Sequence, residues 1–460
     1  MIPARFPHRA PAPGGLGRAL RLLAVALPVW LLARPAEAQL LTFTPDHPDG
    51  IYDVGRRVGW AVGVAPGQSA FPGTYTWVAK RDGETVVGRG AFTLDSLRAT
   101  ARIETSLRRP GMILVEVRPP AGDSGFRGAS KSEIGRVLLG AAVAPTRIRP
   151  SAPRPADFDS FWTAKRRELD AVPAEPVLTP AESGRPGVEY FTVRLNNIRG
   201  AHVYGQLAKP AGAGPFPGLL IYQWASPPYP LQRSWVTDRA AEGWLVLNVE
   251  PHDVPGDLPQ AFYDALPQIV RNYRTIGERS RDESYFLAMY LGDLRAAEYL
   301  ADRPDWDGRT LAVTGISMGG QQSFAVAGLD PRVTALVVDV PAGSDALGAL
   351  HGRAPEYPNW DLALPEVRRT APYFDVTNFA PRIVARSMVA MGFIDETCPP
   401  AGIWATFNAI RGPKEAVPMV DSPHNHMATA EEQQPYTRRA ARWLGVLVQG
   451  GDPTAAAGGP

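Results

Sequence analysis

Ser317 lies in a glycine-rich segment with the sequence GISMGG (residues 315–320), which fits the pattern G-x-S-x-G. The residues before it, TLAVT, predict a strand, and the residues after it, QQSFAVAG, predict a helix. A serine between such elements stands on a tight turn, where glycines are needed because any Cβ would collide in the bend. The helix N-terminus also favours negative charge that develops beside the serine. In this context the pattern predicts a nucleophilic serine, whereas the pentapeptide alone would equally fit an ordinary turn with a capping serine.

A serine hydroxyl is a weak nucleophile, so it needs a histidine base and a carboxylate that orients the histidine. With a nucleophile on this type of turn, the acid follows along the chain and the histidine comes last. Asp395 ends the predicted strand SMVAMGFID and is the first choice for the acid, with Glu396 and Asp339 as rivals. Of the seven histidines, His424 and His426 follow Asp395, so one of these two is expected to be the base.

Backbone N–H groups are expected to stabilise the negative oxygen that forms when a carbonyl carbon is attacked. The first donor is expected at Met318, directly after the nucleophile. The second is expected at Ala225, in the loop after the predicted strand GLLIYQW. This chemistry requires no cofactor. The sequence predicts no metal either, because two close histidines without a third ligand are a weak zinc signal.

The segment 157–447 alternates apolar strand candidates with amphipathic helix candidates. The first helix candidate follows Asp157, its expected N-cap, and places Phe158, Phe161 and Trp162 on one side. Such alternation predicts an α/β fold with a mostly parallel central sheet covered on both faces. The first two strand candidates, EYFTVRL and AHVYGQLAKP, could pair antiparallel at one edge. Ligands of such sheets bind beyond the carboxyl ends of the strands, where the candidate catalytic residues fall.

The flanking segments have a different character. Residues 39–145 contain short alternating segments separated by turn signals, which predict an all-β, immunoglobulin-like sandwich domain without a cluster of catalytic residue types. A packing or substrate-presenting role is expected for it, and carbohydrate binding is left open. Residues 146–156 are rich in Pro and Arg and predict an extended linker. Residues 448–460 are predicted to form a disordered tail.

The N-terminus predicts export. Residues 1–38 combine four early arginines, the apolar run LLAVALPVWLLA and a final Ala-Glu-Ala, which is the pattern of a cleaved signal peptide. The protein is therefore expected to be secreted or periplasmic, with no membrane contact after cleavage. A formal net charge of +2 without a basic cluster does not favour nucleic acid as a partner. The lone cysteine, Cys398, excludes an internal disulfide framework.

From Asp157 to about Leu447 the sequence resembles the acetyl xylan esterase and cephalosporin-C deacetylase family of carbohydrate esterases. The resemblance rests on the ordered segments DFDSFW, DLRAAEYLADRPDWDGRTLAVTGISMGGQQ, DVPAG, PYFDVTNFAPR, MGFIDETCPP and GPKE. It implies an α/β-hydrolase fold and places the family's acid on Asp395. Counting without gaps from GPKE places the family's histidine on His424, which makes His426 the alternative base.

The chain departs from the family pattern at two places. The family usually has Gln-Gly-Gly after the nucleophile, where this chain has Met-Gly-Gly at 318–320. The family's Arg-Gly-Gln motif, expected after the strand WLVLNVE, is replaced by Glu-Pro-His-Asp at 250–253. These changes concern acyl specificity and oligomeric arrangement and leave the triad intact. The predicted sandwich lies outside the resemblance.

Together these features predict a secreted serine esterase that removes acetyl or other short acyl groups from carbohydrate esters, such as acetylated xylan or xylo-oligosaccharides. Trp224 and Tyr229 are candidates to line the substrate pocket and to stack on a sugar. The expected partner is an acylated carbohydrate or another small ester, and a homo-oligomer is left open. The alternatives are a peptidase or a dienelactone-type hydrolase on the same fold, and a non-catalytic carbohydrate-binding protein.

Overall fold

The computed structural model describes residues 41–66, 70–95 and 100–455. The predicted signal peptide, residues 1–38, lies outside the described residues, as do 456–460 at the other end of the predicted tail. The described residues belong to one structural unit, Gln39–Pro460. Among them, no helix has both the length and the apolar character that crossing a bilayer requires.

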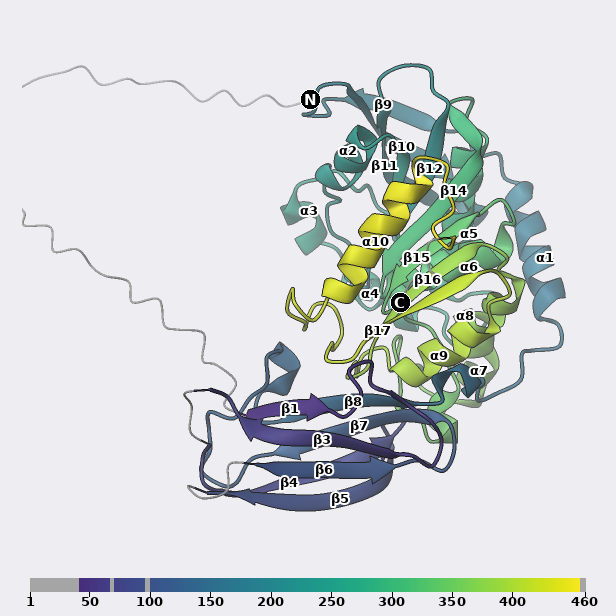
Figure 1. Cartoon of the computed structure of the whole chain (residues 1–460). Coiled ribbons are helices and arrows are strands. Elements are labelled where there is room, and N and C mark those ends of the chain that lie inside the picture. The colour runs from purple at the N-terminus through teal and green to yellow at the C-terminus, as the bar shows by residue number, and fades with distance from the viewer. Residues whose placement is uncertain (1–40, 67–69, 96–99, 456–460) are drawn as a thin grey trace, which may run out of the picture. The chain divides into compact units, whose positions relative to one another are not determined.

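Residues 41–143 form two small sheets that share one apolar core (Figure 1). Within the described part of this region the strand orders are β1-β3-β6 and β2-β8-β7-β4-β5. Buried side chains alternate with exposed ones along β4, as expected for a strand with one face on a core. The hairpin between β4 and β5 turns at Asp82 and Gly83, which both have positive φ. The strands are β1 (Leu41–Pro45), β2 (Ile51–Tyr52), β3 (Arg57–Val64), β4 (Gly73–Arg81), β5 (Thr85–Leu94), β6 (Ala101–Ser106), β7 (Gly111–Arg118) and β8 (Val137–Val143).

The rest of the chain is built around a third, larger sheet with nine strands among the described residues, in the order β17-β16-β15-β14-β12-β13-β11-β10-β9. The six strands from β12 to β17 pair in parallel, and β11, β10 and β9 add antiparallel strands at one edge. The predicted antiparallel pair is therefore present, extended by β9, which the sequence analysis did not include. The strands are β9 (Val177–Ala181), β10 (Val188–Asn196), β11 (His202–Pro210), β12 (Phe216–Tyr222), β13 (Leu245–Glu250), β14 (Trp306–Ile316), β15 (Ala335–Asp339), β16 (Arg386–Gly392) and β17 (Lys414–Met419).

Helices cover both faces of this sheet (Figure 1). One apolar cluster joins the sheet to α1, α5, α6 and α9, and a separate cluster joins its other face to α2 and α10. Buried strands between two such layers have apolar side chains on both faces, as β13 and β15 do. The helices are α1 (Phe158–Asp170), α2 (Ser234–Ala241), α3 (Gln260–Asp264), α4 (Gln268–Arg271), α5 (Tyr285–Ala301), α6 (Met318–Leu329), α7 (Pro365–Thr370), α8 (Val376–Phe379), α9 (Pro400–Ala409) and α10 (Gln434–Leu447). The architecture confirms the predicted mostly parallel sheet preceded by a small all-β sandwich.

One local feature differs from what the sequence suggested, and two segments make contacts that it did not predict. Asp157 occupies the N-cap position of α1, but its carboxylate bonds Tyr373 and Arg281 instead of a helix N–H. The predicted linker 146–156 is tied to the α/β region along its length, for example through Ser151, whose backbone N–H and side chain both contact a buried carboxylate. Part of the predicted disordered tail is also fixed, because Asp452 pairs with Arg386 at 2.8 Å.

Candidate active site

Ser317 stands on the turn between β14 and α6, as the glycine pattern predicted. Its backbone has φ 57° and ψ −119°, a strained conformation for a residue with a side chain. A Cβ on Gly315 would lie 2.2 Å from the backbone carbon of Gly319, and one on Gly319 would lie 2.2 Å from the carbonyl oxygen of Tyr222. Only glycine fits at either position. The turn is held by the Ser317 N–H, which donates to the Asp339 carbonyl at 3.0 Å.

The structure brings Ser317, His424 and Asp395 into one hydrogen-bonded chain. His424 Nε2 lies 3.0 Å from Ser317 Oγ, and His424 Nδ1 lies 2.7 Å from Asp395 Oδ2. Asp395 Oδ1 accepts the backbone N–H groups of Thr397 and Cys398, each at 2.8 Å. These bonds fix the carboxylate as an acceptor, so Nδ1 carries the ring proton and Nε2 is free to accept the serine proton. This is the arrangement of a general base poised on a nucleophile.

Charges around the imidazole favour its basic role. Burial alone would lower the pKa of His424, but the charge and hydrogen bond of Asp395, together with the charge of Asp339, outweigh burial, and the pKa is raised above its ordinary value. Burial also raises the pKa of Asp339 to about 7, with an opposing contribution from His424. The Cys398 thiol is buried beside the same carboxylates, and burial raises its pKa well above the ordinary value. Cys398 is therefore kept as a neutral thiol.

The rival residues are placed differently. The Glu396 carboxylate pairs with Arg136 of the sandwich. The Asp339 side chain is fully buried, and neither of its oxygens has a hydrogen-bond partner within the described residues. His426 is exposed, and its ring centre lies 5.3 Å from that of His424. Of these candidates, Asp395 and His424 are the two that complete the chain to the serine.

The predicted oxyanion donors lie on two elements that pack against each other. Met318 is the first residue of α6, where backbone N–H groups have no partner within the helix. Ala225 belongs to the loop after β12. That loop is held next to α6 because the Gln322 side-chain amide donates to the Gln223 carbonyl at 2.9 Å. The Gln223 side chain is in turn fixed by Tyr229 at 2.9 Å.

Aromatic side chains gather on the same loop. Trp224 is 37% exposed and stacks on Tyr229, with ring centres 5.3 Å apart and planes 15° from parallel. Trp235 meets Trp224 edge-on at 5.2 Å. Both tryptophans line a cleft of about 530 Å³, together with Gly315 and Ile316 directly before the nucleophile. Trp224, backed by Tyr229, therefore presents an aromatic face to a cleft that reaches the residues directly before the nucleophile.

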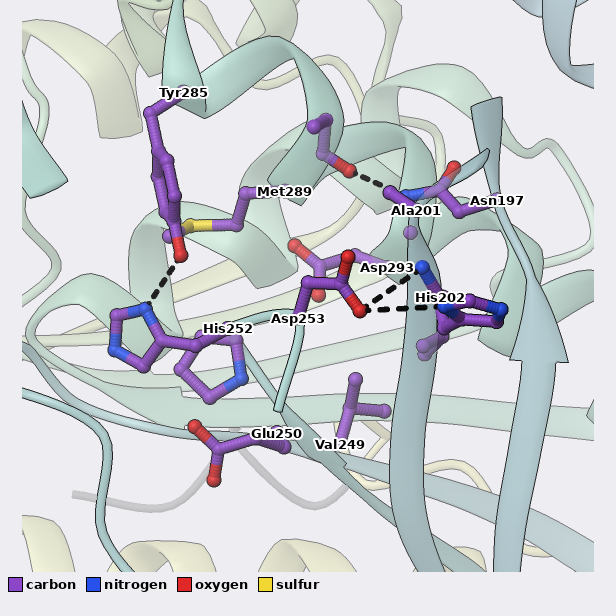
Figure 2. A pocket seen from close by; sticks show the side chains of 14 residues that line it. Asn197, Ala201, His202, Val249, Glu250, His252, Asp253, Tyr285, Met289 and Asp293 are labelled. Atoms are coloured by element: carbon purple, nitrogen blue, oxygen red, sulfur yellow. Dashed lines mark hydrogen bonds and ion pairs between the residues drawn. The ribbon is translucent and has the colours of Figure 1, made fainter. Parts of the chain in front are cut away.

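The segment Glu250–Asp253, which replaces the family's Arg-Gly-Gln, lines a small pocket next to α5 (Figure 2). His252 Nε2 donates to the carbonyl of Ser226 at 2.9 Å, which leaves Nδ1 to accept from the Tyr285 hydroxyl at 2.7 Å. Burial lowers the pKa of His252 to about 4, so the ring stays neutral. His252 thus ties the end of β13 to the loop that carries Trp224 and Ala225.

The same pocket contains two buried acids. Both side-chain oxygens of Glu250 and one of Asp293 lack a hydrogen-bond partner within the described residues. Burial raises the pKa of both carboxyls well above the ordinary value. Neutral carboxylic acids fit this environment. In the ranges that the structure describes, no three His, Cys, Asp or Glu side chains are grouped so that they could hold a metal ion.

Comparisons with known proteins agree with this geometry. The family model described as acetyl xylan esterase (AXE1) matches residues 146–351 and 363–442, more than half of the chain. Acetyl esterase Axe7A of Xylanibacter ruminicola is 29% identical over 424 residues, which cover 90% of this chain and 92% of the relative. This alignment is longer than the chain from residue 146 to its end, so it includes part of the sandwich.

Two solved structures share the fold. The acetyl xylan esterase from Paenibacillus sp. R4 matches with a TM-score of 0.53 and 23% identity, covering 64% of this chain and 96% of that one. Acetyl xylan esterase 1 from Thermoanaerobacterium sp. JW/SL YS485 matches with a TM-score of 0.54 and 21% identity, covering 65% and 96%. These matches confirm the predicted α/β-hydrolase fold. The family model, which matches more than half of the chain, shows that the chain belongs to the acetyl xylan esterase family and is a carboxylic-ester hydrolase.

Proposed function

We propose that this esterase removes acetyl groups from acylated carbohydrates such as acetylated xylan or xylo-oligosaccharides, through an acetyl-enzyme on Ser317. The observation that carries the proposal is the position of His424, which bridges the Ser317 hydroxyl at 3.0 Å and the Asp395 carboxylate at 2.7 Å. The name of the Xylanibacter relative, an acetyl esterase, supports acetyl as the group removed.

The reaction runs in two steps. In the first, His424 Nε2 takes the proton of Ser317 Oγ while that oxygen attacks the ester carbonyl carbon. The N–H groups of Met318 and Ala225 donate to the negative oxygen that results. When the carbonyl reforms, the bond to the sugar oxygen breaks and that oxygen takes the proton from His424. In the second step, water attacks the acetyl group with His424 again as base, which releases acetate and restores the serine.

Sugar recognition is proposed for the aromatic surface of Trp224 and Tyr229. An exposed indole that is backed by another ring offers a flat apolar face at little conformational cost. Trp224→Ala is expected to raise the KM for acetylated xylo-oligosaccharides by about 5- to 20-fold, on the order of 1–2 kcal/mol. The KM for p-nitrophenyl acetate, which lacks the sugar, should stay within about twofold and serves as the control.

The compartment is part of the proposal. Residues 1–38 have the pattern of an export signal, which supports a secreted or periplasmic enzyme that meets its polymer outside the cytoplasm. N-terminal sequencing of the protein recovered from its host would test this, with a mature start at or near Gln39 as the expected result. A start upstream of the apolar run would contradict it.

The function is tested by comparing hydrolysis rates on four kinds of substrate. These are acetylated xylan and acetylated xylo-oligosaccharides, followed by acetate release, p-nitrophenyl esters of increasing acyl length, followed by p-nitrophenol release, and aminoacyl amides, followed by amine release. Acetylated sugars are expected to have the highest kcat/KM, and Ser317→Ala is expected to lower kcat by roughly 10⁴-fold or more. A preference for amides would point to a peptidase. Substantial acetate release by the alanine variant would show that another group is the nucleophile.

A further inference from the structure

Arg136 of the sandwich forms an ion pair with the loop that carries the triad acid. Its guanidinium forms a two-pronged ion pair with Glu396, one bond of which measures 3.2 Å, and Glu396 is the residue directly after Asp395. The Arg136 side chain is 25% exposed and Glu396 is 43% exposed. Arg136 is itself oriented by a hydrogen bond from Nε to the Ser132 carbonyl at 3.2 Å. The pairing therefore joins a fixed arginine to the residue next to the acid.

The same loop also packs on strand β8. Phe393, two residues before Asp395, is buried against Gly140 so closely that a Cβ there would lie 2.5 Å from the Phe393 Cβ. A Cβ on Gly50 would lie 3.2 Å from the Phe393 ring. Met112 and Ala142 of the sandwich also join the apolar cluster of the large sheet. The acid loop thus contacts the sandwich at two points, through Phe393 against Gly140 and through Glu396 with Arg136.

The sandwich also reaches the loop that carries the base. The Lys131 N–H donates to the Met427 carbonyl at 3.1 Å, and the Met427 N–H donates back to the His424 carbonyl at 2.8 Å. Lys131 and Arg136 belong to one segment that is braced internally by buried Glu133, whose carboxylate accepts the Leu138 N–H at 2.9 Å. One rigid segment of the sandwich therefore contacts both catalytic loops.

We infer that the sandwich is a structural part of the catalytic centre, in which Arg136 is a positioning residue that holds Glu396 and thereby fixes the orientation of Asp395 toward His424. The inference rests on the proposed triad. It gives the sandwich a role other than that of a separable carbohydrate-binding module. Because catalysis depends on sub-ångström placement of the acid and base, a loop that shifts by about 1 Å can cost on the order of 100-fold in rate.

A charge exchange across the pair tests this in the full-length protein. Arg136→Glu and Glu396→Arg each place like charges together, and each is expected to lower kcat for p-nitrophenyl acetate by about 10- to 100-fold with KM within about threefold. The double variant restores an ion pair and is expected to recover kcat to within about threefold of the wild type. Arg57→Glu is the matched control. In the wild type, Arg57 and Glu104 form an ion pair of 3.1 Å within the sandwich. The variant places a second carboxylate next to Glu104 there, and kcat should not change.

Each outcome decides the question. Single variants that keep the wild-type kcat, or a double variant that stays impaired, would overturn the inference. If the single variants do not fold, the double variant alone decides by whether its kcat returns. Failure of the triad itself would be visible separately, because Ser317→Ala would then retain activity. Arg136→Glu acting like the wild type while Ser317→Ala is inactive would refute the role of Arg136 and leave the proposed function standing.

Discussion

Replacing Asp395 with asparagine exchanges one carboxylate oxygen for an NH₂ group. The side chain then donates a hydrogen bond to His424 where the carboxylate accepts one. Asp395 Oδ1 accepts two backbone N–H groups at 2.8 Å, from Thr397 and Cys398, and the amide oxygen of asparagine would take that place. The amide NH₂ must then face His424 Nδ1, which lies 2.7 Å from the present Oδ2. Two N–H donors cannot face each other, so Nδ1 becomes the acceptor and the ring proton moves to Nε2. Nε2 can then no longer accept the proton of Ser317.

The wrong tautomer should remove most of the general-base catalysis without removing the binding site. In serine triads this substitution lowers kcat by about 10⁴-fold, which corresponds to about 5.5 kcal/mol of transition-state stabilisation. We expect a loss of this order for Asp395→Asn, with KM within about threefold of the wild type. The fold should be retained, because the asparagine keeps the bonds to the two backbone groups.

The assay is steady-state hydrolysis of p-nitrophenyl acetate at pH 7.5, with far-ultraviolet circular dichroism as the check on folding. Asp339→Asn is the matched control, since this buried carboxylate at the end of β15 makes no hydrogen bond to His424, and its loss of kcat should stay below about tenfold. A folded Asp395→Asn protein that loses less than about tenfold would refute the reasoning. A larger loss of kcat for Asp339→Asn than for Asp395→Asn would show that Asp339, and not Asp395, is the acid of the triad.

Three further predictions concern the same turn and its base. Asp395 raises the pKa of His424 above the ordinary 6.5, and the imidazole must be neutral to act as a base. The value of kcat/KM should therefore fall as the pH drops through that raised pKa, with the midpoint of the acid limb above 6.5. A midpoint below about 6 would contradict this. Gly319→Ala should lower the free energy of unfolding in urea by roughly 1–3 kcal/mol or more, since its Cβ would lie 2.2 Å from a carbonyl oxygen. Gly445→Ala is the control: this glycine of α10 has open space around it, and the substitution should be neutral or stabilising by up to about 1 kcal/mol. Equal effects of the two substitutions would refute the steric argument. The Ser317→Gly variant should unfold at a higher urea concentration than the Ser317→Ala variant, because a φ of 57° suits glycine. The free energies of unfolding should differ on the order of 1 kcal/mol. The reverse order would show that the turn is not strained.

The nucleophile and its turn could be predicted from local sequence because a few neighbouring residues determine the geometry of that turn. The G-x-S-x-G turn needs glycine at fixed offsets, and the structure shows the reason at Gly315 and Gly319, where any Cβ would meet backbone. The apolar strands and the order of serine, acid and histidine along the chain also follow from short patterns. The fold class was predicted on these grounds, and the family from the resemblance of six ordered segments; both predictions are confirmed.

Other features depend on contacts between distant segments and leave little trace in local sequence. Asp395 and Glu396 are neighbours of the same charge, and contacts with distant residues separate their roles. Arg136, 260 residues away, pairs with Glu396, whereas His424 bonds Asp395. Asp157 was expected to cap its helix, but the tertiary partners Tyr373 and Arg281 take its carboxylate. The helix α10 was missed, although the spacing of buried Ala440, Trp443, Leu444 and Leu447 is that of an amphipathic helix and could have revealed it.

Covalent labelling tests the central claim most directly. A fluorophosphonate probe reacts with a serine that is activated by a neighbouring base. We predict a single adduct on Ser317, located by mass spectrometry in the tryptic peptide 310–332, with no labelling in Ser317→Ala and a rate reduced by about 100-fold or more in His424→Gln. Labelling of another residue, or labelling of the wild type that is indifferent to the histidine, would contradict the account.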